Sequence, residues 1–144
     1  MCVSLAVFVA SRRALRSRES NTTYAPPLWL IALGAALVGL AAGGVLYAWP
    51  PSRERRRIAV GAAAAVAGFL VWRGALIYAD GANFDIDYPL LLGLSFEDIG
   101  TGVMAFLFAA LAFGLVTDRA DSAQRVVTSA ALVGAAAMLV DRFV

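Results

Sequence analysis

The chain has 144 residues, of which 61% are hydrophobic and 15% are charged, with a formal net charge of +2. A soluble domain of average composition carries ~25% charged residues, and a domain this small leaves much of its surface in water. The composition therefore argues against a soluble globular domain. The small, dispersed net charge argues against a nucleic-acid-binding protein.

The residue types that are missing restrict the chemistry. The sequence contains no His, and Cys2 is its single cysteine. A Ser-His-Asp or Cys-His mechanism cannot be built within this chain, and no CxxC metal or redox motif is present. We expect no enzymatic activity, no cofactor and no metal site. All basic residues are Arg and Ala is abundant, which predicts a GC-rich genome, an extreme halophile first and an actinobacterium as the alternative.

Residues 1–24 form an N-terminal segment with two interpretations. The run Met1 to Ala10 is apolar but too short to span a bilayer. Four arginines follow it, whereas a secretory signal has basic residues before its apolar run. The segment is either a short helix at the membrane surface or the product of a translation start assigned too early.

The first predicted membrane span covers residues 28–49, which carry no charge. A pair of prolines stands just before it, where helices tolerate proline. Pro50 and Pro51 end it, because proline removes donors and clashes with the preceding turn. Aromatic residues near both ends, Trp29 and Trp49 among them, are typical of membrane interfaces.

A basic loop, residues 52–57, separates this span from a second one over residues 58–79. Such loops remain on the cytoplasmic side. Arg73 interrupts the second span about 9 Å from its far end, at 1.5 Å per residue. Its side chain is long enough to reach the outer interface from there.

The longest connection, residues 80–98, carries five acidic residues and no basic residue, and we expect it on the external side. Its middle, Tyr88 to Leu94, is too apolar for a free loop and should fold back onto the bundle or lie in the interface. Ser95 and Asp98 match the capping pattern of a following helix.

The third span is predicted over residues 99–116 and the fourth over residues 123–140, with Asp121 or Ser122 capping the fourth. The uncharged part of the fourth, residues 126–140, reaches only about 22 Å at 1.5 Å per residue. Neighbouring arginines that snorkel, or local thinning of the bilayer, would close this gap.

Together these elements predict an all-α integral membrane bundle of four transmembrane helices in one membrane domain, with a short interfacial helix as an N-terminal alternative. Four spans with the basic loop inside place the N-terminus outside. Its own arginine cluster conflicts with that side. A spurious start, or a first helix that does not cross, would remove the conflict.

Small residues recur along the first span, where Ala35, Gly39 and Gly43 are spaced four apart. Such spacing lets two helix backbones approach closely in lipid. The alternatives are homodimerisation through this face and packing inside the four-helix bundle. Either one predicts a close-packed bundle.

Charged residues supply the remaining candidate sites. Arg73 is an intramembrane charge, which marks a functional-site hypothesis, and Asp80 lies two turns further on the same face. Their alternatives are an anion path and a snorkelling arginine paired with a loop carboxylate. Asp85 and Asp87 offer oxygen ligands for a hard cation, but they lack an EF-hand spacing.

The sequence favours a small structural or accessory membrane protein. Its expected partners are the lipid bilayer and either a second copy or another membrane protein, and no nucleic acid. The alternatives are a small oligomeric transporter or channel subunit, in which Arg73 would act, and a membrane enzyme using Asp85, Asp87 or Glu97.

Overall fold

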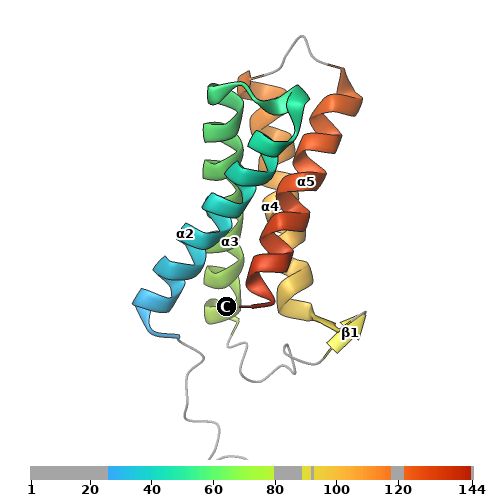
Figure 1. The fold of residues 1–144 in the computed structure, drawn as a ribbon. Coiled ribbons are helices and arrows are strands. Elements are labelled where there is room, and N and C mark those ends of the chain that lie inside the picture. The colour runs from blue at the N-terminus through green and yellow to red at the C-terminus, as the bar shows by residue number, and fades with distance from the viewer. Residues whose placement is uncertain (1–25, 80–88, 92, 118–121, 144) are drawn as a thin grey trace, which may run out of the picture.

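Proline pairs and capping residues divide the described part of the chain into four α-helices that pack as a bundle (Figure 1). The computed structural model describes residues 26–79, 89–91, 93–117 and 122–143. Each helix packs on its neighbour in the chain, and the last packs against the first to close the ring. The four helices are α2 (Leu28–Ala48), α3 (Arg55–Tyr78), α4 (Phe96–Ala112) and α5 (Ala123–Asp141).

Three short elements join these helices. A 3-10 turn, η1 (Pro50–Ser52), links α2 to α3, and a π-helical turn, η3 (Phe113–Thr117), extends α4. A two-stranded antiparallel hairpin of β1 (Pro89–Leu91) and β2 (Leu94–Ser95) precedes α4. With η3 included, all four helices are long and apolar enough, by length and composition, to cross a membrane.

The connection between α2 and α3 covers residues 49–54, so it ends three residues before the end of the predicted loop 52–57. The helix α3 begins at Arg55, because Glu54 has an extended backbone and the arginines that follow it are good helix formers. Arg57 therefore lies within the helix and is buried, with its guanidinium carbon 5.1 Å from the centre of the Phe113 ring.

The helix α4 begins at Phe96, three residues before the predicted start at Ile99. A capping box fixes this start, since Asp98 N–H donates to Ser95 Oγ at 3.1 Å and Ser95 N–H donates to Asp98 Oδ2 at 2.7 Å. This confirms the capping pattern of Ser95 and Asp98. It also places Glu97 and Asp98 in the first helical turn, although they were expected at the end of the acidic loop.

The helix α5 is longer than its uncharged part. Ser122 is its N-cap, accepting a hydrogen bond from the Arg125 N–H at 3.4 Å, which confirms one of the two predicted caps. Its 19 residues span about 28 Å at 1.5 Å per residue. The helix includes Asp141, one residue beyond the predicted end.

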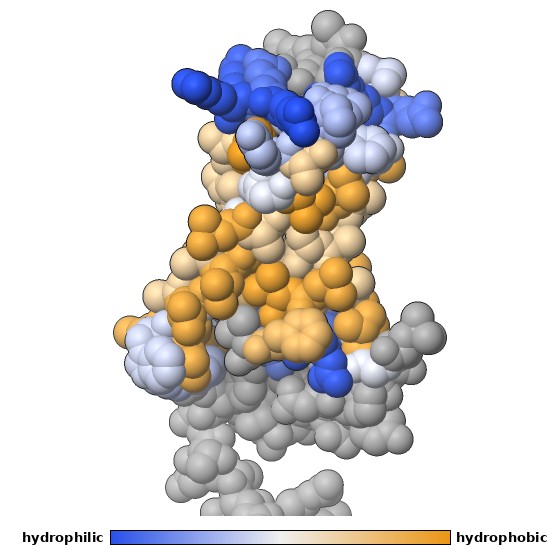
Figure 2. All heavy atoms as spheres, viewed as in Figure 1, coloured by the Kyte–Doolittle hydropathy of each residue, from blue (hydrophilic) through white to orange (hydrophobic). Residues whose placement is uncertain are grey.

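Small side chains fill the centre of the bundle and large apolar ones cover its outside. Leu40, Leu111 and Leu115 are each more than 60% exposed, whereas the buried hydrophobic residues are mostly alanine. Figure 2 shows the result as a broad apolar band below a polar end. The core consists of Ala35, Val38, Ala42, Leu46, Ala64, Ala65, Phe69, Ala105, Ala109, Phe113, Ala130, Val133 and Ala137.

The small residues of α2 face α3 within the bundle. Ala35 is buried, a methyl group on Gly39 would lie 2.9 Å from Val66 Cγ2, and one on Gly43 would lie 3.6 Å from Ile58 Cγ2. Within the single chain, Ala35 is therefore buried and Gly39 and Gly43 lie against α3.

Two glycines lie where the backbones of neighbouring helices approach each other closely. A methyl group on Gly68 would lie 2.7 Å from the backbone N and Cα atoms of Ala105, so α3 and α4 touch through their backbones there. On the next pair of helices, a methyl group on Gly134 of α5 would lie 2.7 Å from the Gly102 carbonyl oxygen of α4.

We predict that Gly68→Ala destabilises the fold by about 1–3 kcal/mol, the usual cost of overpacking. The new methyl group meets backbone atoms, which cannot move without separating two helices. Gly74→Ala on the same helix is the matched control, because nothing lies within 4 Å of its added methyl group. Thermal unfolding followed by circular dichroism measures both, and equal midpoints would contradict the contact described here.

Candidate functional site

Arg73 joins three helices at the end of the bundle opposite η1. Its side chain, which is 15% exposed, extends from α3 toward the first turn of α4 and the last turn of α5. One terminal nitrogen, Nη1, forms an ion pair with Glu97 Oε1, and Nη2 donates to Asp141 Oδ1 at 2.8 Å. The planar guanidinium is suited to bridging two carboxylates in this way.

Thr101 completes the contacts of the Asp141 carboxylate. Its hydroxyl donates to Asp141 Oδ2 at 2.6 Å, so both carboxylate oxygens accept a hydrogen bond. Thr101 lies one turn after Glu97 on the same face of α4. The side chain of Asp141 is fully buried. We refer to Arg73, Glu97, Thr101 and Asp141 as the charge network.

Aromatic side chains enclose the charge network. The guanidinium carbon of Arg73 lies 5.3 Å from the centre of the Phe69 ring, within the range of a cation–π contact. The indole N–H of Trp72 donates to the Glu97 carbonyl oxygen at 3.1 Å, and its ring packs on Phe96 with centroids 5.6 Å apart. These contacts hold the cation away from bulk solvent.

The two carboxylates are stabilised in different ways. Glu97 lies in the first turn of α4, where the helix dipole favours a negative charge. Asp141 lies in the last turn of α5, where the dipole disfavours one. Asp141 therefore depends on Arg73 and Thr101 for its stabilisation more than Glu97 does.

The charge network is suited to fixing the relative positions of α3, α4 and α5. Its acids are bound to Arg73, and the described residues contain no group of three or more His, Cys, Asp or Glu side chains that could hold a metal ion. Next to it, a cavity of about 140 Å³ lies between α3 and the start of α2. The cavity is lined by Pro26, Leu30, Ile31, Phe69 and Arg73.

The structure places the predicted site residues as follows. Arg73 is at the centre of the charge network, with partners on two other helices. Asp80, its predicted partner, lies outside the described residues, as do Asp85 and Asp87. Glu97, expected at the end of an outer loop, is one of the two carboxylates that Arg73 binds.

Thr101 and Asp141 are not among the residues that the sequence predicts for this site. Helical periodicity offers a signal for Asp141, which follows Val133 and Ala137 at four-residue intervals on the buried face of α5. Thr101 likewise follows Glu97 by four residues, which places the two on the same face of α4. Neither spacing identifies the residue that Thr101 or Asp141 contacts, because the order of the helices in the chain does not tell which helix faces pack together.

Comparisons with protein-family models, with curated proteins and with solved structures found no match to this chain. A function is therefore proposed below from the chemistry and arrangement of the described residues.

We predict that Arg73→Met destabilises the fold by about 3–5 kcal/mol, because it leaves two buried carboxylates without their cation. Arg142→Met is the matched control, since Arg142 is exposed just beyond the end of α5. Combining Arg73→Met with Glu97→Gln and Asp141→Asn should recover much of the loss, since no unpaired charge remains. Thermal unfolding midpoints should be lowest for Arg73→Met, higher for the triple variant and nearly unchanged for Arg142→Met. A triple variant less stable than Arg73→Met would contradict the prediction.

Proposed function

We propose that this chain is an integral protein of the cell membrane whose four helices α2 to α5 each cross the bilayer, and that it serves there as a structural or accessory protein. The observation that carries the proposal is the distribution of apolar side chains, with small ones inside and large ones outside. In water such a surface would be costly, whereas lipid solvates it.

The exposed area supports membrane insertion. Only 22–33% of the most apolar window of each helix is buried inside the bundle. Large aromatic residues are exposed near the helix ends: Trp29 and Tyr47 are each more than 60% exposed and Tyr78 is 94% exposed. Trp and Tyr near the ends of apolar helices are typical of membrane interfaces.

The charge distribution supports one orientation. We define the basic end as residues 50–57 with the first turn of α5, where Arg53, Arg55, Arg56 and Arg125 are exposed. Positively charged connections remain in the cytoplasm, so we place the basic end there. The end that carries the charge network and leads into the acidic stretch 80–88 then faces outward.

The contacts of Arg73 favour a structural role over transport. An anion moving along this helix would have to displace Glu97 and Asp141, both already paired with Arg73. The cavity beside Arg73 is the observation that favours the alternative, a transporter or channel subunit formed by several copies. In the structural role the partners are the bilayer and a second copy or another membrane protein.

Insertion and orientation are tested by labelling in intact cells. In a Cys2→Ser background, we expect Phe143→Cys to react with a membrane-impermeant maleimide from outside. Arg55→Cys should react only after permeabilisation. Both positions are exposed, so a failure to label reports sidedness and not burial. Release of the folded protein by alkaline carbonate would contradict insertion, and the opposite labelling pattern would contradict the orientation alone.

Transport is tested with purified protein in liposomes. We expect the flux of chloride, protons or potassium to equal that of empty liposomes, because the intramembrane cation is neutralised within the bundle. A flux that is present in the natural chain and abolished by Arg73→Lys, which keeps the charge but not the forked geometry, would favour the transporter. Arg142→Lys serves as the control substitution.

A further inference from the structure

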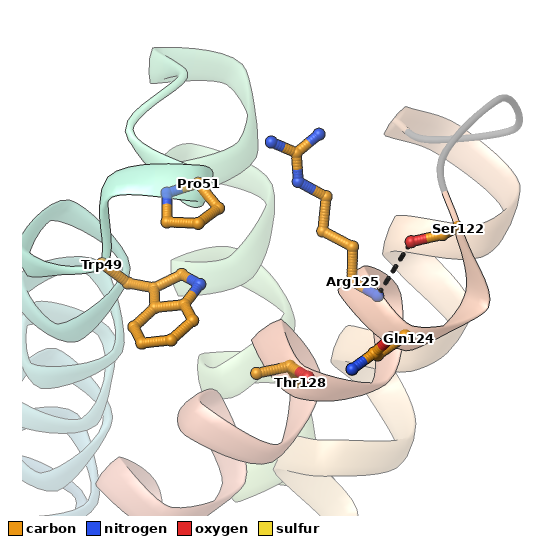
Figure 3. A pocket seen from close by; sticks show the side chains of 6 residues that line it. All are labelled: Trp49, Pro51, Ser122, Gln124, Arg125 and Thr128. Atoms are coloured by element: carbon orange, nitrogen blue, oxygen red, sulfur yellow. Dashed lines mark hydrogen bonds between the residues drawn. The ribbon is translucent and has the colours of Figure 1, made fainter.

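The basic end contains a second, larger cavity that the charge network does not explain. It has a volume of about 390 Å³ and lies between η1 and the first turns of α5 (Figure 3). Its lining consists of Trp49, Pro51, Ser122, Gln124, Arg125 and Thr128.

The two walls of this cavity differ in chemistry. Trp49 and Pro51 form one wall with their rings (Figure 3). The opposite wall comes from α5 and carries polar side chains, the guanidinium of Arg125 among them. Such a cavity fits a ligand with both an apolar part and an anionic, hydrogen-bond-accepting part.

Arg125 is the charged residue of the cavity lining, and other arginines of the basic end are held by hydrogen bonds. Arg53 Nε donates to the Tyr47 carbonyl oxygen at 3.0 Å, and Arg56 Nη2 donates to the Val116 carbonyl oxygen at 3.2 Å. Among the described residues of the basic end, Glu54 is the one carboxylate. A cavity lined with one sign of charge raises the local concentration of oppositely charged ligands.

The level of the cavity along the bundle indicates the source of the ligand. Its lining includes Trp49, just beyond the end of α2. At this end of the bundle, Figure 2 shows a boundary between polar residues and the apolar band. In a bilayer this boundary is the headgroup region, which Trp residues prefer. Basic pockets between spanning helices on the cytoplasmic side suit anionic headgroups.

We propose that this cavity binds the phosphate group of an anionic membrane lipid, with Arg125 contacting the phosphate and Trp49 and Pro51 contacting the apolar glycerol and acyl region. The proposal rests on the membrane insertion proposed above. Arginine forms short, charge-assisted hydrogen bonds with phosphate oxygens. Gln124 and Thr128 supply further donors on the same wall.

The test is a titration of detergent-purified, delipidated protein with phosphatidylglycerol, and with phosphatidylcholine of the same acyl chains, read by native mass spectrometry. We expect preferential retention of phosphatidylglycerol. Arg125→Gln should weaken it about five-fold or more, the scale of one basic residue at a lipid surface. Two controls remove the same charge elsewhere: Arg55→Gln at the basic end but outside the cavity, and Arg142→Gln at the other end of α5.

A cavity-filling substitution separates shape from charge. Thr128→Phe keeps every charge but occupies the cavity, and it should reduce phosphatidylglycerol binding while the thermal midpoint shows that the protein is folded. If Arg55→Gln lowers binding as much as Arg125→Gln, the attraction is a diffuse surface charge and the site is wrong. Equal retention of phosphatidylcholine would also overturn it.

A titration with inorganic phosphate distinguishes binding of a lipid headgroup from binding of a free phosphate ion. Phosphate at millimolar concentration should compete weakly with the lipid and should not raise the thermal midpoint alone. Stabilisation by phosphate without lipid would assign the cavity to a soluble anion and overturn the lipid proposal. Because every arm starts from protein extracted from membranes, a loss of lipid binding would leave membrane insertion standing.

Discussion

Close approach of helix backbones through small side chains is the constraint on which this fold depends. At Gly68 and Gly134 a single methyl group would meet backbone atoms of the next helix. In lipid no hydrophobic force drives helices together, so contact has to come from dispersion and from interhelical polar contacts. Alanine and glycine inside the bundle bring the helices close enough for dispersion contacts. Leucine then faces outward.

The polar contacts follow from the same constraint. An alanine-rich interface offers few shape features that would distinguish one axial register from another. The charge network supplies them, because Arg73 reaches Glu97 and Asp141 together only when α4 and α5 are correctly placed along α3. A buried ion pair contributes little net stability, so its main effect here is to select one arrangement of the helices.

Elements that depend on local sequence could be predicted, and those that depend on which faces meet could not. Proline pairs, the Ser95 capping box and the Ser122 cap are local, and they define the helices within a few residues. The start of α3 was misplaced because the run Arg55 to Arg57 was expected to be solvated, although one of its arginines is buried against Phe113. Asp141 was missed because its partner lies 68 residues away.

The helix α3 carries an arginine directed into the bundle near each end, and the two have different surroundings. Arg73 binds two carboxylates, whereas Arg57 lies over the Phe113 ring at the basic end. Sixteen residues separate them, about 24 Å along a helix, less than a ~30 Å hydrocarbon core. In the proposed orientation this spacing leaves each side chain within a few residues of one membrane interface, which a long arginine side chain can reach. Because both side chains contact residues of other helices, their positions depend on the whole bundle and not on α3 alone.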